Sequence, residues 1–401
     1  MNGIKVYRIG LSTAAGLFGA ALTSPAYAVL EATPFAFYRV ERDDNVFRHR
    51  DSAEAAAQSA TNDPEMADTL QIYGVGMDAS YTISNQTFFL DGRINKTTYS
   101  RFDFLDFDGS DVNGGLEWKL GSNLNGDVTL GRTRNLRDFA DFSGGVQRSI
   151  EPATTGSAGA SLAILSDYEI NGRVGTSRIR NSLATSRDAD LDEDSVTIGA
   201  AYKGRTGISL GVEAVFLSGE YIERTPIEGY DQRTYQVVAT WKPSPVSSFE
   251  GAIGSTERDN DISNQADFSG ATGSLSMTYN FSPKTYGMLS VQRNVSSVDE
   301  QNENFVVVNG GSMFLAWNPS ALLETSFSLL RQNEDYRGQV PGMMAREDDL
   351  LSMTLSADYS VGRYVVLSPS IAYEDRTSNQ DFQEYDDWRY GLELRLQYPI
   401  P

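Results

Sequence analysis

Long stretches of this chain alternate strictly between apolar and polar residues, and this pattern limits the possible folds more than any other feature. In the stretch nearest the end, two sets of residues alternate: Trp388, Tyr390, Leu392, Leu394, Leu396 and Tyr398 with Arg389, Gly391, Glu393, Arg395 and Gln397. Similar runs cover residues 196–202, 274–281 and 351–361. Successive side chains of a β-strand point to opposite faces, so each run predicts a strand with one apolar and one polar face.

Two kinds of connection alternate between these runs. One kind is short and rich in Gly, Pro and Asn, as at 84–86, 121–123, 204–206, 242–245, 282–284, 318–320 and 361–363. The other kind is longer, polar and acidic, as at 48–66, 138–150, 181–193, 298–304 and 337–348. Two strands, a tight turn and a long loop therefore form a repeating unit.

An aromatic residue precedes most of the short turns and gives the length of this unit. These aromatic residues are Tyr81, Trp118, Tyr202, Trp241, Tyr279, Trp317, Tyr359 and Tyr398. Neighbours in this set are 37 to 42 residues apart, except for one gap of 84 residues around Leu165, which equals two steps. Units of about 40 residues over this length predict about 18 strands, within a range of about 16–18.

The pattern predicts an all-β fold, a single closed antiparallel transmembrane β-barrel with short periplasmic turns and longer extracellular loops. A soluble β-propeller also repeats about every 40–45 residues, but it needs four short strands per repeat. It also needs a dry core, whereas one whole strand face is polar here. In a barrel, the aromatic residues before the turns form a membrane girdle at headgroup depth. Closure is required because an open edge would leave unpaired backbone groups in lipid.

The first 28 residues have the pattern of a secretory signal peptide. Lys5 and Arg8 precede a nearly unbroken run of apolar and small residues, and Ala26-Tyr27-Ala28 is a small-x-small cleavage site. We therefore predict removal of residues 1–28 and one outer-membrane barrel over 29–401. The predicted location is the outer membrane of a Gram-negative bacterium.

Composition excludes several other classes of protein. The chain has no cysteine, which excludes disulfides, Cys-based zinc sites and a Cys nucleophile. A net charge of −21 argues against nucleic acid as a partner. The single histidine, His49, is expected to be exposed in the first long loop, so the sequence predicts no enzyme activity, no cofactor and no metal site. Acidic clusters at 43–44, 192–194, 347–349 and 386–387 are expected to be solvated loop tips, although carboxylates can hold divalent cations that bridge lipopolysaccharide phosphates.

Strand parity identifies charged residues that are candidates for the lumen lining. They are Asp78, Asp91, Arg93, Glu213, Glu250, Glu324, Asp358, Glu374, Arg389, Glu393 and Arg395. Acids outnumber bases in this set, which fits a polar pore that disfavours small anions. It also fits an ordinary solvated barrel lining, and both interpretations stay open.

Two stretches resemble a known family. The first is Phe37-Tyr38-Arg39-Val40-Glu41-Arg42-Asp43-Asp44-Asn45-Val46-Phe47-Arg48. The second runs from Tyr99-Ser100-Arg101-Phe102 through Asp106-Phe107-Asp108-Gly109 and Leu116-Glu117-Trp118 to Leu136-Arg137-Asp138-Phe139-Ala140-Asp141-Phe142. Over residues 35–145 the chain resembles the EpsL-like outer-membrane barrels of exopolysaccharide biosynthesis clusters, within the wider group of β-barrel porins. The family motif maps onto Asp43, Asp44, Asn45, Phe47 and Arg48, and the resemblance assigns these residues no role.

The resemblance implies a passive channel for a secreted polysaccharide. Its partners would be outer-membrane lipid and lipopolysaccharide, the polysaccharide itself, and periplasmic and inner-membrane export machinery. Two alternatives stay open: a general or small-solute porin, and a structural or adhesive barrel whose loops, such as 48–66 and 181–193, bind a ligand. Barrel proteins commonly finish on an aromatic residue, whereas this sequence finishes on Tyr398-Pro399-Ile400-Pro401. Tyr398 is the aromatic residue expected to serve that role.

Overall fold

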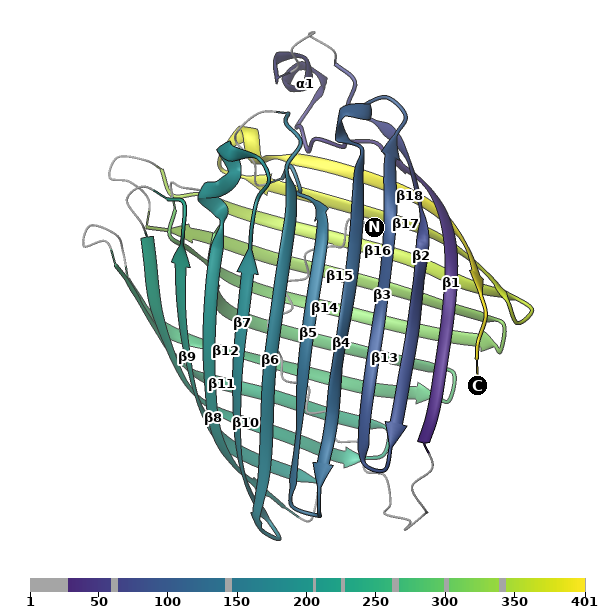
Figure 1. Ribbon diagram of the computed structural model, residues 1–401. Coiled ribbons are helices and arrows are strands. Elements are labelled where there is room, and N and C mark those ends of the chain that lie inside the picture. Colours follow the sequence, from purple (N-terminus) through teal and green to yellow (C-terminus); the bar gives the residue numbers. More distant parts are fainter. Residues whose placement is uncertain are drawn as a thin grey trace.

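The fold is a single 18-stranded antiparallel sheet that closes on itself (Figure 1). The computed structural model describes residues 28–58, 64–140, 146–204, 207–224, 228–261, 267–298, 303–338 and 344–400. The strands are β1 Ala28–Asp43, β2 Asp68–Ile83, β3 Gln86–Tyr99, β4 Phe107–Leu120, β5 Leu124–Leu136, β6 Ile150–Leu165, β7 Tyr168–Ile179, β8 Leu191–Lys203, β9 Ile208–Tyr221, β10 Glu228–Ser244, β11 Ser247–Asn260, β12 Phe268–Ser282, β13 Thr285–Ser296, β14 Phe305–Ser320, β15 Leu323–Arg337, β16 Glu347–Val361, β17 Val365–Ser378 and β18 Tyr385–Gln397. The predicted fold class and strand number are confirmed.

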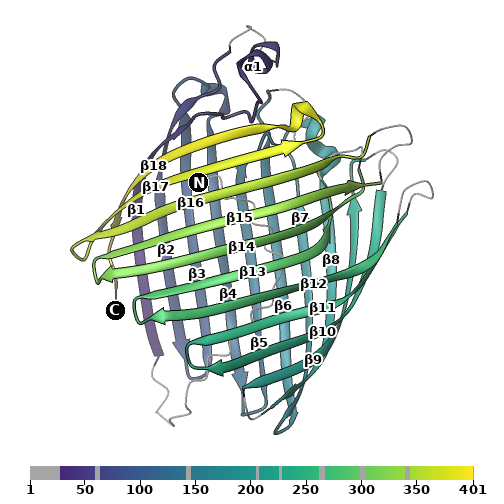
Figure 2. The ribbon, with the colours of Figure 1, turned by 180° about the vertical axis from the view of Figure 1, so that it is seen from behind.

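Closure is made by the first and last strands. Each strand pairs with its neighbours in sequence, and β1 pairs with both β2 and β18. The β1–β18 register runs from Phe35 opposite Gln397 to Asp43 opposite Arg389. Figure 2 shows the opposite wall, where β10–β18 complete the cylinder. A closed sheet has no free edge, so its backbone N–H and C=O groups find partners within the wall.

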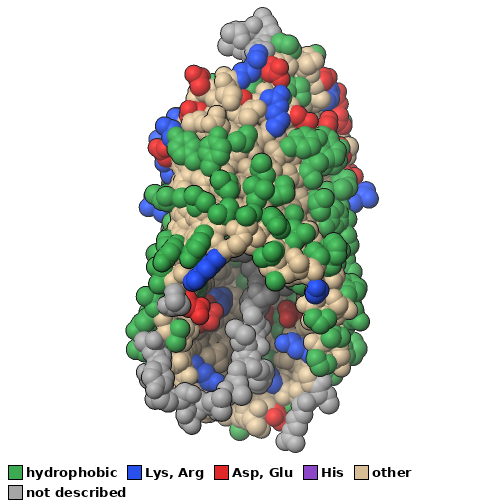
Figure 3. Space-filling view, turned by 90° about the vertical axis from the view of Figure 1, so that its right-hand side faces the viewer, with side chains coloured by type: hydrophobic (Ala, Val, Ile, Leu, Met, Phe, Trp, Pro, Cys, Tyr) green, Lys and Arg blue, Asp and Glu red, His purple; other side chains and the backbone are tan. Residues whose placement is uncertain are grey.

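The outer face of the wall is apolar, as the alternating pattern predicts. Side chains such as Leu130 and Ile253 are 66% and 70% exposed, and each is in a row of similar residues on its strand. Figure 3 shows hydrophobic side chains over the wall, and acidic and basic side chains inside the hollow below them. An apolar exterior of this extent is unfavourable in water and favourable against lipid acyl chains.

The two ends of the barrel differ. At the turn end the strands are joined by short connections, and at the loop end by the longer ones. The loop end carries the helix α1 Ser52–Gln58 and three short 3-10 helices, Asp103–Leu105, Ala184–Ala189 and Asp381–Gln383. Among the described residues, no helix combines the length and the apolar character that a membrane span needs.

Local sequence explains the start of α1. The Asp51 carboxylate accepts hydrogen bonds from the backbone N–H groups of Ala53 and Glu54 at 3.0 and 2.9 Å. The Glu54 carboxylate in turn accepts one from the backbone N–H of Arg50 at 2.9 Å. These reciprocal bonds resemble a capping box and satisfy N–H groups that the first turn leaves free.

The details of several elements differ from the sequence-based expectation. The first strand covers residues 28–43, so it begins at the predicted cleavage site and ends at the first residue of the family motif. The turn near Leu165 has its aromatic on the following strand: Tyr168 packs against Tyr202 with ring centroids 5.3 Å apart. The predicted signal peptide lies outside the described residues except for Ala28, where β1 begins, and it stays a prediction.

The predicted girdle residues lie near the turn end, on rows shared with exposed apolar side chains. Seven of them are exposed and Trp118 is half-buried: the exposed set is Tyr81, Tyr202, Trp241, Tyr279, Trp317, Tyr359 and Tyr398. Tyr364 lies near the end of the last strand, and its ring stacks on that of Tyr398 with centroids 5.8 Å apart. Rings at this depth suit the headgroup region, and their anchoring role stays a prediction.

The inside and outside of the wall can be distinguished by charge substitution on β11. Ile253 lies midway along the strand on the apolar face, and Ala252 lies beside it on the other face. We expect Ile253→Lys to lower the free energy of unfolding in lipid vesicles by about 2–4 kcal/mol, because the ammonium group would meet acyl chains.

Ala252→Lys is the matched control and should cost much less, since its ammonium group would meet the aqueous lumen. Equilibrium denaturant titration of the vesicle-inserted proteins measures both. Equal costs for the two variants would contradict the assigned faces.

Candidate functional site

The inner face of the wall is lined by hydroxyl groups that hydrogen-bond between strands. Thr256 contacts Thr234 at 2.8 Å and Thr272 at 2.7 Å, which links β10, β11 and β12. Ser290 and Ser312 lie 2.7 Å apart on β13 and β14. Small polar side chains of this kind leave a lumen that water can fill.

The register places all the predicted lumen residues on this polar face. Directly opposed strand residues share a face, as Asp78 and Asp91 do on β2 and β3 and Glu324 and Asp358 do on β15 and β16. The set with the same parity is Asp78, Asp91, Arg93, Glu213, Glu250, Glu324, Asp358, Glu374, Arg389, Glu393 and Arg395. Their role in a pore stays a prediction.

Several inward arginines along the wall pair with carboxylates. Arg395 on β18 reaches across β1 to Asp78 at 2.6 Å. Arg173 pairs with Asp127 at 2.6 Å, and the Arg39 Nε bonds to the Glu41 carboxylate at 2.9 Å. These bases therefore contribute little net positive charge to the lumen.

Eight inward carboxylates near the turn end have no such partner among the described residues, six of them from the predicted set together with Glu31 and Glu117; one inward base there, Lys119, is also unpaired. Among the described residues no base forms an ion pair with Asp91, Glu213, Glu250, Glu324, Asp358 or Glu393. Each lies within five residues of the turn end of its strand. The turn end of the lumen therefore carries net negative charge, distributed over several strands around the wall.

The loop end is organised around the motif at the end of β1. The Asp44 carboxylate accepts a hydrogen bond from the backbone N–H of Trp388 at 2.6 Å. Asn45 donates from Nδ2 to the backbone carbonyls of His49 and Asp386 at 2.7 and 2.8 Å. The motif thus ties the first loop to β18 at the seam where the barrel closes.

Arg48 is the centre of a buried ion-pair network at this seam. Its guanidinium lies 3.1 Å from Asp387 of β18, 3.6 Å from Asp43 of β1 and 3.8 Å from Asp138 of the β5–β6 loop. Burial alone would lower the pKa of Arg48, but these three carboxylates hold it well above its ordinary value, so the group stays charged. Removing one member of such a network would leave buried charge uncompensated.

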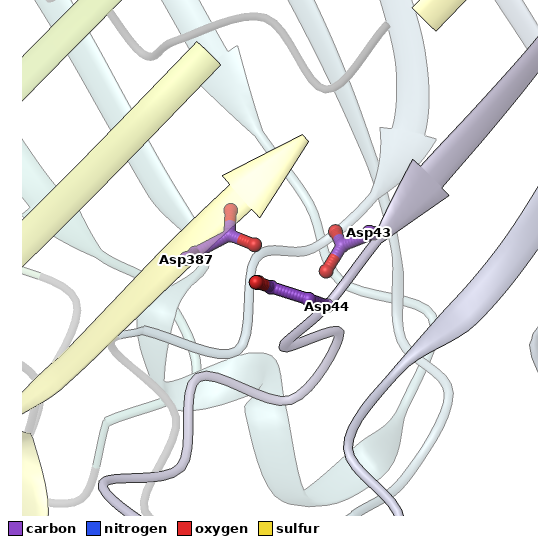
Figure 4. A group of neighbouring side chains, drawn as sticks. All are labelled: Asp43, Asp44 and Asp387. Carbon is purple, nitrogen blue, oxygen red and sulfur yellow. The ribbon is translucent and has the colours of Figure 1, made fainter. Parts of the chain in front are cut away.

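The carboxylates of Asp43, Asp44 and Asp387 come close enough to suggest a cation site (Figure 4). One oxygen from each lies within 4.8 Å of the others. The guanidinium groups of Arg48 and Arg389 approach Asp387 at 3.1 and 2.9 Å, however. Ca²⁺ needs about six to eight oxygen ligands, and two adjacent cations oppose its binding. The geometry therefore favours an ion-pair network over a metal centre.

The β5–β6 loop crosses the loop end of the barrel. The guanidinium of Arg376 on β17 donates to the backbone carbonyl of Ala140 at 3.0 Å. Because β4, β3, β2, β1 and β18 lie between β5 and β17 in the sheet, this contact spans a chord of the barrel. The ring of Phe47 packs against Phe102 and Phe139 with centroids 4.6 and 5.1 Å away, which joins three loops in one apolar cluster.

A second loop is folded against the opposite part of the wall. The Val298 carbonyl accepts hydrogen bonds from the Tyr221 hydroxyl at 2.6 Å and from Arg224 at 3.0 Å. Val298 follows β13, whereas Tyr221 ends β9, so this contact spans β10, β11 and β12. Ala140 and Val298, the described residues of these two loops that make the contacts, therefore bond to strands that are not their neighbours in the sheet.

Two expectations about the loops were wrong. His49 is buried, its ring lies 5.8 Å from that of Phe47, and burial lowers the pKa of its imidazole. Among the described residues no hydrogen bond joins this imidazole to a serine, so a Ser-His site is not formed here. The acidic clusters are not all solvated tips either, since Asp43, Asp348 and Asp387 are buried and ion-paired.

Neither a known sequence family nor a curated protein matches the chain. Among solved structures, OpdK of Pseudomonas aeruginosa with vanillate is similar, with 11% identity, a TM-score of 0.47 and coverage of 92% of this chain and 99% of that one. OccK2 (OpdF) of the same organism in complex with glucuronate has 12% identity, a TM-score of 0.47 and coverages of 92% and 98%. OccAB3 of Acinetobacter baumannii has 10% identity, a TM-score of 0.48 and coverages of 92% and 99%. At such low identity these likenesses say nothing about a substrate.

A closed antiparallel barrel with an apolar exterior and a polar interior is the architecture of bacterial outer-membrane proteins. The 18 strands of this chain form such a barrel, so the predicted outer-membrane location is confirmed.

The seam network can be tested by replacing its central cation. Arg48→Met keeps an unbranched, largely apolar side chain but removes the guanidinium, which leaves Asp43 and Asp387 buried without this partner. We expect the variant to lose about 3–5 kcal/mol of unfolding free energy at neutral pH. Equilibrium unfolding in detergent or vesicles measures the loss.

The neighbouring Arg50 provides the control, because its side chain is 41% exposed and pairs with the exposed Asp381 at 3.2 Å. Arg50→Met should leave the unfolding midpoint unchanged. If Arg48→Met were as stable as Arg50→Met, the network would not hold the seam.

Proposed function

We propose that the protein is a passive diffusion channel for small polar solutes across the outer membrane, with a preference for cations. The observation that supports this function is the charge distribution of the lumen. Inward arginines such as Arg173 and Arg395 pair with carboxylates, whereas eight inward acids near the turn end have no ion-pair partner among the described residues.

Charge of one sign on the wall of a narrow aqueous pore changes the local concentration of ions. The low-dielectric wall and the lipid behind it focus the field of the carboxylates into the lumen. Cations are attracted and small anions are repelled, while neutral polar solutes exchange hydrogen bonds with the hydroxyl-lined wall. No energy source is needed for such passage.

The loops support a size limit for the solute. The chord from Ala140 to Arg376 and the contact between Val298 and Tyr221 place protein across parts of the loop end. Buried ion pairs and a shared aromatic cluster hold the first of these loops in place. A fixed constriction favours small molecules over a wide polymer.

Selectivity can be measured in a planar bilayer with a salt gradient. We expect a reversal potential on the cation-selective side for the natural protein. The double variant Glu324→Gln/Asp358→Asn removes two of the eight uncompensated carboxylates and should reduce the cation preference by roughly a quarter, because selectivity follows the charge of the lining.

Glu257→Gln/Asp259→Asn is the matched control, since both acids lie on the outward rows of β11 that include Ile253. It should leave the reversal potential unchanged. Anion selectivity of the natural protein, or equal effects of the two double variants, would contradict the proposal.

Passage of an exopolysaccharide is the second candidate function, and the resemblance of residues 35–145 to EpsL-like barrels favours it. In that case the partners would include the polymer and periplasmic and inner-membrane export machinery. The motif residues Asp44, Asn45 and Arg48 do not themselves carry the polysaccharide function, because their contacts hold the seam and the loops.

Solute size separates the two candidates. In liposome swelling, a small-solute channel should admit monosaccharides fastest and exclude oligosaccharides progressively with length. Steady passage of long oligosaccharides, at rates close to those of monosaccharides, would favour the polysaccharide function and overturn the small-solute proposal.

A further inference from the structure

The outward face of the barrel carries a basic patch although the chain is strongly acidic. Lys96 on β3 and Arg132 and Arg134 on β5 belong to outward rows near the loop end. Arg132 continues the exposed apolar row of Val128 and Leu130 on the same strand. These three bases, here called the outer basic patch, therefore lie directly beyond the apolar part of the wall.

The outer basic patch contains one acid, because Asp108 on β4 lies opposite Lys96 on the same outward face, and its net charge is therefore about two positive charges. Within the described part of the chain, Lys96 and Arg132 form no ion pair, and the guanidinium of Arg134 donates to the backbone carbonyl of Asp108 at 2.8 Å. The neighbouring Arg178 differs, because its guanidinium pairs with Asp194 at 2.9 Å. The two arginines therefore give the patch a net positive charge at the border between the apolar wall and the loops.

An apolar groove begins next to the patch. It has a volume of about 780 Å³ and runs over β5 to β10, where its apolar lining includes Val128, Leu130, Val174, Val196 and Phe216. Small residues on β6, Gly156 and Ala158, also line it.

The floor of the groove at β6 is closely packed. A Cβ atom at Gly156 would come within 3.2 Å of Thr176 Cγ2 and 3.4 Å of Leu130 Cδ2. The small side chains on β6 therefore keep the groove open between larger side chains on both sides. The charged residues at its other end include Asp194, which Arg178 neutralises.

We propose that this part of the outer wall binds a phosphorylated lipid of the outer leaflet, of the lipid A type. Arg132 and Arg134, with Lys96 beside them, hold the headgroup phosphates, and an acyl chain lies along the groove. The site faces the bilayer, so it is separate from the channel and does not depend on the nature of the solute.

Charge complementarity selects this occupant. Guanidinium groups bind phosphate oxygens through short charge-assisted hydrogen bonds, and these are strong at a partly dehydrated membrane interface. Farther round the outer wall the outward acids Asp192 and Asp194 are paired with Arg178 and Arg180, so the unpaired outward arginines Arg132 and Arg134 are the groups beside the groove that attract a phosphate.

Native mass spectrometry of the folded full chain in detergent tests the site directly. The probe is hexa-acylated lipid A with two phosphates, compared with the same lipid after dephosphorylation and with phosphatidylcholine. We expect the bisphosphorylated lipid to bind in a one-to-one complex and the other two to bind much more weakly. Each base near an anionic lipid surface contributes about fivefold, so Arg132→Ala/Arg134→Ala should weaken binding by about twentyfold.

Two further variants separate the headgroup and acyl contributions. Ala158→Phe fills the groove and should weaken binding while the basic patch stays intact. Arg331→Ala removes an exposed outward arginine on β15 and should have no effect. Heat modifiability on gels verifies that each variant forms the barrel.

Several results would overturn the site. They are equal binding of the dephosphorylated lipid, unchanged binding by the double arginine variant, an equal loss with Arg331→Ala, and a stable oligomer that Ala158→Phe dissociates. None of these results would bear on the ion selectivity of the channel.

Discussion

The structure depends on the pairing of its first strand with its last. In the hydrocarbon region no water can satisfy a free N–H or C=O group, so a sheet must close or remain outside the membrane. The β1–β18 register provides that closure, and Asp44 extends it beyond the strand by accepting the backbone N–H of Trp388. The seam is also where the chain concentrates buried charge around Arg48. Closure and loop anchoring are therefore one structural problem, solved by residues that are adjacent in sequence.

The arrangement of apolar residues is inverted relative to a water-soluble protein. Most large apolar side chains face outward, and the largest buried apolar cluster lies at the loop end, where Phe47, Leu105 and Leu136 pack together. This cluster and the ion pairs around it give the loops a fixed position. The turn end has no comparable cluster among the described residues, and there the lining acids face an open lumen. In the proposed channel, the loop end would limit the size of the solute and the turn end would set the charge preference.

Sequence alternation was sufficient to predict the strands, their number and the face of each lining residue, because a strand has a period of two whatever surrounds it. The paths of the loops could not be predicted in this way. Their contacts, such as Arg376 with Ala140, join residues far apart in sequence that only the closed barrel brings together. The sequence did contain a sign of these loop contacts. Phe47, Phe102 and Phe139 are apolar residues in otherwise polar loops, and their rings pack together in the structure. His49 and Asp43 were expected to be exposed. Their burial depends on partners from β18 and from other loops, which the sequence around them does not reveal.

Cysteine cross-linking at the seam tests closure most directly, since the chain has no cysteine of its own. Val40 lies opposite Leu392 on the outer face, so Val40→Cys/Leu392→Cys places two thiols at a spacing that a disulfide can bridge. The closed barrel predicts rapid disulfide formation in this pair after mild oxidation of the folded protein, and none when Val40→Cys is combined with Leu396→Cys, four residues out of register. Cross-linking of neither pair, or of the second pair alone, would contradict the closed barrel on which the channel and the lipid site depend.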